Sequence, residues 1–323
     1  MNKKVLVTGG AGFIGSTLIR ELLKDGYKVD ILDNFSTGLF ENLPSNNKLQ
    51  TITGDIRDFE LVSTAVKGHS HLIHLAAQPF IPLSYQLPLQ VVNVNTMGSI
   101  NIFKACLDHD VKRLVHISSS EVYGSAQYTP MDEQHPLQPF STYSVAKAAA
   151  DMWAQTLHWE HKLPVVILRP FNTFGPYDTQ PRFISEMIRQ CFKEPKIHVG
   201  NLEASRDLTY VQDTVEAMIM ALEAEGLEGD VINIGTCKTW KMRDILELIK
   251  KQTKTEEKEV VTDTSRLRPK DVMTLLTDNS KAKKVLGWAP CTPFEEGVRK
   301  TISWYLNNGK MWGYEIRGWR WRY

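Results

Sequence analysis

Short apolar runs alternate with amphipathic stretches along the first half of the chain. The apolar runs predict buried strands at residues 4–8, 29–33, 51–53, 71–75, 114–117 and 165–168. Between them, apolar residues recur at helical spacing and predict helices over residues 13–24, 88–108 and 141–159. Strands that alternate with helices indicate βαβ units. We therefore expect an α/β fold with a Rossmann-type, doubly wound parallel sheet covered by helices on both faces.

The regular alternation of strands and helices ends after Arg169-Pro170, where prolines and glycines mark a loop-rich stretch. An apolar run at residues 231–234 then predicts that the chain returns to the sheet. We expect a first domain over residues 1–169, with a returning segment near 206–235, and a smaller mixed α/β portion over residues 170–323. The length of 323 residues fits roughly two domains.

Composition and charge exclude several classes of protein. Lys and Arg number 38 against 37 Asp and Glu, so the net charge of +1 argues against binding nucleic acid through bulk charge. No apolar run approaches the roughly 20 residues that cross a bilayer, and Thr8 soon interrupts the N-terminal one. We expect no membrane association and a cytoplasmic location. The four cysteines lie far apart, so we expect reduced thiols and no metal site.

A glycine cluster joins the first strand to the first helix. Gly9, Gly12 and Gly15 allow a tight turn, a close approach of the backbone to a pyrophosphate, and close packing of the helix on the sheet. Asp33 ends the second strand, where its carboxylate can accept both ribose hydroxyls and repel a 2′-phosphate. The pattern predicts NAD rather than NADP.

Neighbouring residues complete the predicted cofactor site. Asp55 follows the third strand and is placed to reach the adenine, although a plain turn residue is an equal alternative. The remaining candidates are Phe13 and Ile14 within the glycine cluster, Asn34 and Ile56 beside the two aspartates, Leu75, Ala76 and Ala77 at the end of the fourth predicted strand, and Tyr143 and Lys147 on a predicted helix.

Tyr143 and Lys147 stand four residues apart and share one face of a predicted helix. We expect the Lys147 ammonium to lower the pKa of Tyr143 and to hold the nicotinamide ribose. Tyr143 is then a candidate base toward a sugar hydroxyl while a hydride leaves the same carbon.

Together these motifs resemble the extended short-chain dehydrogenase/reductase family of NAD-dependent nucleotide-sugar epimerases and dehydratases. The resemblance reaches to about residue 305. Beyond the motifs already described, it is carried by residues 74–77, 118–124, 169–176, 206–213, 266–269, 280–283 and 286–288. The resemblance implies tightly held NAD recycled within one turnover, and a homodimer joined through helices at about 90–108 and 141–160. It also implies that Ser119 shares a hydrogen bond with the sugar oxygen O4.

Glu121 distinguishes the possible reactions. In the family, dehydratases and decarboxylases carry glutamate here, whereas epimerases have a small or hydroxyl residue. Once C4 is a ketone, a carboxylate beside C5 can remove the acidified C5 proton and drive loss of the C6 hydroxyl as water. Ser120 departs from the aspartate that dTDP-glucose dehydratases use as the acid, and a serine hydroxyl is a poor acid. Either Glu121 serves as both base and acid, or the sugar is not glucose.

The Ser120-Glu121 pair resembles two groups: the UDP-N-acetylglucosamine 4,6-dehydratases of the legionaminic-acid type and the UDP-glucuronate decarboxylases. Residues 121–128, 201–209 and 266–276 look most like the first group, and the last segment lacks the paired aspartates usual in the second. Arg206 and Arg268 match positions that grip the diphosphate, and Asn172 matches an amide that contacts the substrate. Arg266 is a weaker candidate.

These observations predict an NAD-dependent 4,6-dehydratase acting on a nucleotide-diphosphate sugar, with UDP-N-acetylglucosamine as the favoured substrate. The catalytic candidates are Ser119, Ser120, Glu121, Tyr143 and Lys147. The alternatives are a UDP-glucuronate decarboxylase, a nucleotide-sugar 4-epimerase, and a non-catalytic NAD-binding regulator. The Trp- and Arg-rich stretch at residues 311–323 is expected to pack on its own domain or on a partner subunit.

Overall fold

Seven parallel strands form the main sheet of the computed structural model, which describes residues 4–308. They are β1 (Lys4–Thr8), β2 (Lys28–Asp33), β3 (Leu49–Thr53), β4 (His71–His74), β5 (Arg113–Ile117), β6 (Val165–Pro170) and β10 (Val231–Ile234). The order across the sheet is β10-β6-β5-β4-β1-β2-β3, so the direction of winding reverses between β1 and β4. In such sheets ligands bind outside the carboxyl ends of the strands at this reversal. The predicted Rossmann-type α/β fold is confirmed.

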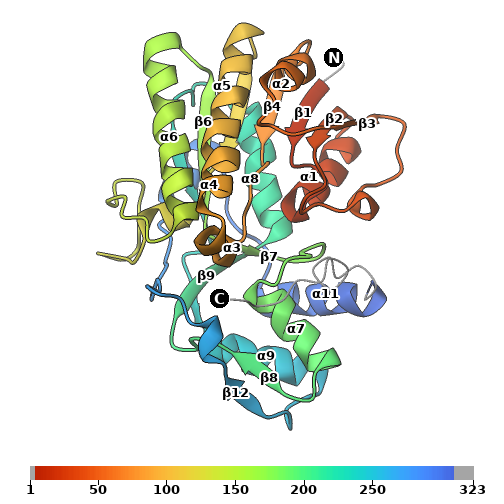
Figure 1. The fold of residues 1–323 in the computed structure, drawn as a ribbon, viewed down its shortest axis with the longest axis vertical. Coiled ribbons are helices and arrows are strands. Elements are labelled where there is room, and N and C mark those ends of the chain that lie inside the picture. Colours follow the sequence, from red (N-terminus) through yellow and green to blue (C-terminus); the bar gives the residue numbers. More distant parts are fainter. Residues whose placement is uncertain (1–3, 309–323) are drawn as a thin grey trace.

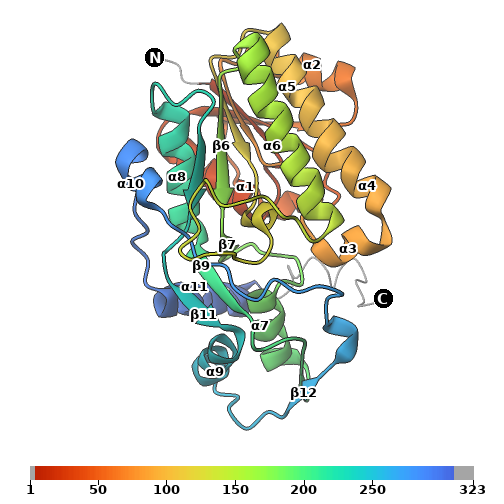
Figure 2. The ribbon, with the colours of Figure 1, turned by 90° about the vertical axis from the view of Figure 1, so that its left-hand side faces the viewer.

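Helices cover both faces of the sheet (Figures 1 and 2). One face carries α1 (Phe13–Lys24) and α8 (Val211–Glu223); the other carries α2 (Phe59–Val66), α4 (Pro88–Val92), α5 (Ser99–Asp108) and α6 (Thr142–His161). Alternate strand residues serve the two faces: Val5 and Val7 pack in the cluster with α1 and α8, whereas Leu6 packs in the cluster with α2 and α5. Both faces are therefore buried, as the continuous apolar runs predicted.

The helix predicted over residues 88–108 is interrupted. Residues Asn93–Gly98 form a π-helical turn between α4 and α5. Within it, the Asn95 side chain accepts from the Gln78 backbone N–H at 2.7 Å and donates to the Gln78 carbonyl at 3.1 Å. The short helix α3 (Ile81–Gln86) precedes α4. The π-helical turn, which is wider than an α-helical one, thus carries the Asn95 side chain that holds the loop after β4.

A smaller lobe lies beyond the carboxyl ends of the main strands (Figure 1). Its three-stranded sheet has the order β11 (Thr239–Lys241), β9 (Ser205–Tyr210), β7 (Asn172–Phe174), and β8 (Ile197–Val199) pairs with β12 (Val260–Thr262). Its helices are α7 (Phe183–Lys193), α9 (Met242–Thr253) and α11 (Phe294–Asn307); α10 (Ser280–Leu286) contacts β10. Strand β10 pairs with β6 in the main sheet. The domain boundary at residue 169 stays a prediction.

No helix within residues 4–308 combines the length and the apolar character needed to cross a membrane. The Trp- and Arg-rich stretch at residues 311–323 lies outside the described residues.

Candidate active site

Two connected clefts open at the carboxyl edge of the main sheet. The first is lined by the predicted cofactor residues that follow β1, β2, β3 and β4: Gly9, Gly12, Phe13, Ile14, Gly15, Asp33, Asn34, Asp55, Ile56, Leu75, Ala76 and Ala77. The second lies between the sheet and the smaller lobe. It is lined by Ser119, Ser120, Glu121, Tyr143, Lys147, Asn172, Arg206, Arg266 and Arg268. Phe13, Leu75 and Arg182 border both clefts. The structure therefore gathers all the predicted site residues around one continuous opening.

The glycine loop leaves no room for side chains. A Cβ at Gly15 would lie 2.3 Å from the Gly9 carbonyl oxygen, and a Cβ at Gly9 would lie 2.7 Å from the Ala76 nitrogen. Gly9 also has a φ of +74°, which side-chain-bearing residues rarely adopt. Helix α1 begins at Phe13, directly after the loop, so its free N–H groups face the first cleft. This cradle of bare backbone at a helix N-terminus fits the pyrophosphate of a dinucleotide.

Asp33 is held rigidly at the end of β2. Its Oδ2 accepts from the Ala11 backbone N–H at 2.9 Å, and its Oδ1 accepts from the Phe35 backbone N–H at 2.8 Å. A carboxylate accepts about four hydrogen bonds in all. The ordered carboxylate fits the two hydroxyls of an adenosine ribose.

Asp55 is engaged with its neighbours at the far end of the first cleft. Its Oδ2 accepts from Asn34 Nδ2 at 2.8 Å, and Arg57 donates to both of its oxygens. The hydrogen bonds from Arg57 lower the pKa of Asp55 to about 2. Arg57 was not predicted from the sequence. It places a cation on the wall of the cleft near the predicted adenine position.

Tyr143 and Lys147 project from the first turns of α6. Ser141 begins this helix, and its hydroxyl accepts from the Ser144 N–H while Ser144 Oγ accepts from the Ser141 N–H. The Tyr143 hydroxyl forms a hydrogen bond with the side chain of Ser119. Lys147 Nζ donates to the Ile117 carbonyl at 2.8 Å. Both side chains are almost fully buried, which fixes them at the floor of the second cleft.

The expected lowering of the Tyr143 pKa is not what this environment produces. Burial raises the pKa of Tyr143 to about 12, the hydrogen bond with Ser119 opposes this, and the charge of Glu121 adds to it. Burial also lowers the pKa of Lys147 to about 8, against the charge of Asp151. Desolvation therefore outweighs the electrostatic help that the spacing of Tyr143 and Lys147 predicted.

Glu121 lies in a short helical turn at the end of β5. Residues Ser120–Tyr123 form this 3₁₀ turn, and the Ser119 hydroxyl accepts from the Glu121 backbone N–H at 3.2 Å. The Glu121 side chain is nearly buried. Its Oε1 lies 3.8 Å from an Nη of Arg268, which comes from the smaller lobe. The carboxylate thus stands between the main sheet and a cation from the opposite wall.

The predicted substrate-binding side chains differ in the hydrogen bonds and ion pairs that they already make within the protein. Arg206 is buried and donates to the Ser205 carbonyl at 3.0 Å, and it lies 3.5 Å from Asp271. The buried Asn172 Oδ1 has no hydrogen-bond partner among the described residues. Arg266 is committed elsewhere: it donates to Glu186 and to Asp263. Arg206 and Asn172 are therefore better placed to receive a ligand than Arg266.

Comparison with known proteins identifies the family. The profile of the family described as GDP-mannose 4,6 dehydratase matches residues 6–301. The chain belongs to this family. A mouse dTDP-D-glucose 4,6-dehydratase is 34% identical over 327 residues, which cover 96% of this chain and 90% of the mouse protein.

Solved structures of this dehydratase and epimerase family share the fold. DesIV, a dTDP-glucose 4,6-dehydratase from Streptomyces venezuelae solved with NAD and TYD bound, superposes with a TM-score of 0.92 at 27% identity, covering 96% of this chain and 99% of DesIV. A UDP-N-acetylglucosamine 4-epimerase from Methanobrevibacter ruminantium M1, solved with UDP-N-acetylmuramic acid, has a TM-score of 0.88 at 31% identity; the match covers 95% of this chain and 99% of the epimerase. This family member is an NAD-dependent enzyme of nucleotide-sugar metabolism. The roles of its individual residues stay predictions.

The sequence did not predict several charged residues that line the second cleft, among them Arg182 and Asp271. Arg182 precedes α7, pairs with Asp178, and lies 5.6 Å from the centre of the Phe13 ring. Asp271 lies 3.5 Å from Arg206 and 4.0 Å from Arg268. Asp271 lies inside the segment 266–276, which carried part of the resemblance. A carboxylate three residues after the predicted diphosphate ligand Arg268 could have been recognised as a site residue from the sequence. Arg182 follows Pro181 in a loop without a motif, and only the fold reveals its position.

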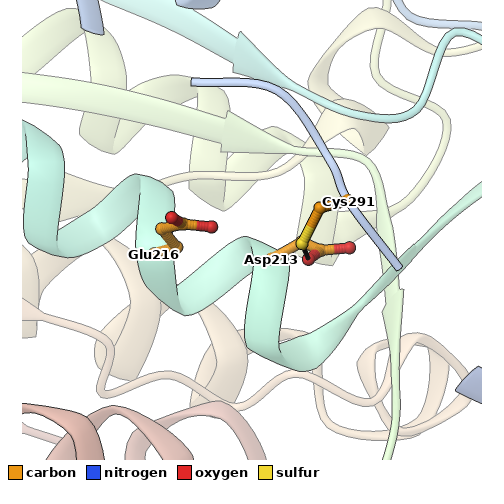
Figure 3. Close-up of side chains that lie close together, drawn as sticks. All are labelled: Asp213, Glu216 and Cys291. Carbon is orange, nitrogen blue, oxygen red and sulfur yellow. Dashed lines mark hydrogen bonds between the residues drawn. The ribbon is translucent and has the colours of Figure 1, made fainter. Parts of the chain in front are cut away.

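A further cluster of carboxylate and thiol groups lies in the structure. Asp213 and Glu216 on α8 face Cys291 (Figure 3). Asp213 accepts from the Cys291 thiol, from the Thr292 backbone N–H and from the Thr292 hydroxyl, at 3.2, 3.1 and 3.0 Å. These contacts tie the segment before α11 to α8 and account for the buried carboxylate.

Proposed function

We propose that this protein is a 4,6-dehydratase that converts UDP-N-acetylglucosamine into a 4-keto-6-deoxy sugar. The observation that carries the proposal is the Glu121 carboxylate in the second cleft, beside Tyr143 and opposite Arg268. An epimerase needs only a ketone, rotation of the sugar and return of the hydride. A carboxylate at this point serves a reaction that also moves a proton at C5.

The first step is oxidation at C4. Tyr143 takes the O4 proton, Ser119 orients the sugar oxygen through the hydrogen-bond network of the two hydroxyls, and Lys147 supports the pair. NAD held in the first cleft would supply the hydride acceptor for this oxidation. Burial raises the pKa of Tyr143 to about 12, so its hydroxyl is protonated in the resting site at neutral pH. That proton goes to solvent water before the phenolate takes the proton from O4.

Loss of water follows at C5 and C6. Glu121 removes the C5 proton, the C5–C6 double bond forms, and the C6–O bond breaks. The departing hydroxyl takes a proton and leaves as water. The hydride returns to C6 and C5 regains a proton, so the product lacks one water relative to the substrate. Since Ser120 replaces the usual acid, Glu121 delivers the proton it has just removed to the leaving hydroxyl.

The smaller lobe supplies the contacts for the diphosphate. Arg206 and Arg268 offer two guanidinium groups, and such planar donors pair with phosphate oxygens in a bidentate manner. The unpartnered Asn172 amide oxygen supports a hydrogen bond to a substrate hydroxyl or amide N–H. An N-acetyl group provides such an N–H. The resemblance of segments 121–128 and 201–209 favours UDP-N-acetylglucosamine over glucose.

A substrate screen read by mass spectrometry tests the proposal. The purified protein is incubated separately with UDP-N-acetylglucosamine, UDP-glucose, dTDP-glucose and UDP-glucuronate. We expect a product lighter by one water from UDP-N-acetylglucosamine. Water loss from dTDP-glucose alone would keep the reaction and change the sugar. Loss of carbon dioxide from UDP-glucuronate would make the protein a decarboxylase. An unchanged mass leaves epimerisation or a non-catalytic role, which proton NMR of the mixtures separates.

We also propose that two copies of the chain associate through α4, α5 and α6. These helices lie side by side on one face of the sheet (Figure 2). Helices α4 and α6, and the π-helical turn between α4 and α5, carry large exposed apolar side chains: Leu89, Met97, Val145, Met152, Trp153 and Trp159. Exposed apolar groups gathered on neighbouring helices favour burial against a partner. A second copy is the occupant that the family resemblance supports.

Charging this face is expected to yield monomers. The double variant Met152→Glu and Trp153→Glu places two carboxylates where apolar contacts are expected, so it should elute at 36.8 kDa in light scattering, whereas the wild type elutes at twice that mass. Phe40→Glu is the matched control, since Phe40 is exposed and lies outside these helices. A double variant that remains dimeric would place the interface elsewhere.

A further inference from the structure

One buried carboxylate lies beneath the proposed catalytic groups without belonging to any predicted role. Asp151 on α6 is fully buried. Its Oδ2 accepts from the Ser118 hydroxyl at 2.8 Å and from Arg169 Nε at 2.9 Å. Its Oδ1 lies 3.5 Å from His116 Nε2. A buried charge is costly unless it is paired and hydrogen-bonded, so this arrangement calls for a specific reason.

The partners of Asp151 frame the segment that carries Glu121. Ser118 opens this segment at the end of β5, and Tyr123 closes its 3₁₀ turn. Arg169, which binds Asp151, also donates to the Tyr123 hydroxyl at 3.0 Å. The Tyr123 hydroxyl in turn donates to Asn233 Oδ1 at 2.8 Å on β10. Asp151 and Arg169 therefore hold both ends of the segment that contains Ser119, Ser120 and Glu121.

Asp151 also acts on Lys147. It follows Lys147 by four residues on α6, which puts the two side chains on one helix face. Burial lowers the pKa of Lys147 to about 8, and the negative charge of Asp151 raises it against that effect.

Titratable groups on four packed elements surround this pair. They are Tyr143 on α6, His116 on β5, His74 on β4 and Arg169 on β6. His74 and His116 stack at 5.4 Å, and burial lowers the pKa of both. They are therefore neutral near pH 7. Among these neighbours, Asp151 is the anion and Arg169 is the competing cation.

We propose that Asp151 is a positioning residue that keeps Lys147 in its ammonium form and fixes the Ser118–Tyr123 segment for the reaction. It touches neither sugar nor cofactor and acts through Lys147, Ser118 and Arg169. The inference rests on the proposed proton transfer at Tyr143, and it does not depend on which sugar is the substrate.

The sign of the pH effect follows from the charges. Lys147 works as an ammonium, so function falls as the pH rises through the pKa of Lys147. Asp151→Asn keeps the shape but removes the negative charge, which lowers the pKa of Lys147 further. The alkaline limb of kcat against pH should therefore move to lower pH by about one unit. Asp151→Glu keeps the charge and should leave the limb in place even if kcat falls.

Two variants separate this role from a structural one. Ser118→Ala removes a hydrogen bond to the same carboxylate without changing any charge, so it should lower kcat and leave the limb unmoved. Arg169→Gln removes the competing cation and should move the limb to higher pH. A purely structural defect would not move the alkaline limb to lower pH in Asp151→Asn and to higher pH in Arg169→Gln.

A second experiment measures the affinity of NAD-free protein for NAD as a function of pH. Fluorescence titrations are run from about pH 6 to about pH 10. We expect the alkaline loss of affinity to move to lower pH in Asp151→Asn. This readout holds even if no sugar in the screen reacts, so failure of the proposed function and failure of this inference are distinguishable. A folded Asp151→Asn variant whose two profiles coincide with the wild type overturns the inference. If that variant does not fold, an Arg169→Gln limb that fails to rise overturns it.

Discussion

Replacing Glu121 with glutamine is expected to abolish loss of water while leaving NAD binding intact. Glutamine has nearly the same shape, but its neutral amide cannot remove the C5 proton or return it to the leaving hydroxyl. General acid and base groups contribute about 10²–10⁴-fold, and Glu121 is assigned both tasks, so we expect a fall in kcat of at least about 10³-fold. The measurement is the mass of the product from UDP-N-acetylglucosamine.

A matched control and an isotope experiment sharpen this test. The control is Glu203→Gln. Glu203 is an exposed glutamate of the smaller lobe that pairs with Arg243, so this variant should retain full activity. In deuterated water the wild-type product should carry deuterium at C5, because C5 regains its proton during the reaction. The Glu121→Gln variant should leave the C5 proton in place. Full water loss in that variant would remove Glu121 from the mechanism.

Replacing Tyr143 with phenylalanine should stop the reaction one step earlier. The change removes the hydroxyl that bonds with Ser119 and that takes the O4 proton. Without a base at O4 the sugar is not oxidised, so C5 never becomes acidic. We expect kcat to fall by about 10³–10⁴-fold, with both water loss and exchange at C5 absent. Turnover and exchange are followed by mass spectrometry and NMR.

The control for this change is Tyr128→Phe. Tyr128 is exposed and hydrogen-bonds to Asp132 outside the two clefts, so its loss should leave kcat unchanged. A Tyr143→Phe variant with more than about a tenth of wild-type kcat would show that another group accepts the O4 proton. Tyr143→Phe and Glu121→Gln together separate oxidation at C4 from elimination at C5 and C6, whichever nucleotide sugar is the substrate.

Much of the architecture follows from local pattern. The predicted strand at 4–8 and helix at 13–24 coincide with β1 and α1, and the strand at 231–234 coincides with β10. The glycine loop and the Tyr143–Lys147 pair depend on spacing within a single turn or helix, which sequence displays directly. The interruption of the helix at 93–98 was missed; within this turn Asn95 bonds with the backbone of the distant Gln78, a contact that periodicity does not display.

The sequence alone determined the α/β class, the glycine cradle at the start of the first helix, and the residue types that border the two clefts. Only the tertiary structure decided their environment. It brought Arg268 to 3.8 Å from Glu121, committed Arg266 to Glu186, and buried Tyr143 so that its pKa rises rather than falls. Periodicity and motifs record contacts between residues close in the chain. Burial and ion pairing depend on which distant segments meet at the carboxyl edge of the sheet, and no local pattern records that.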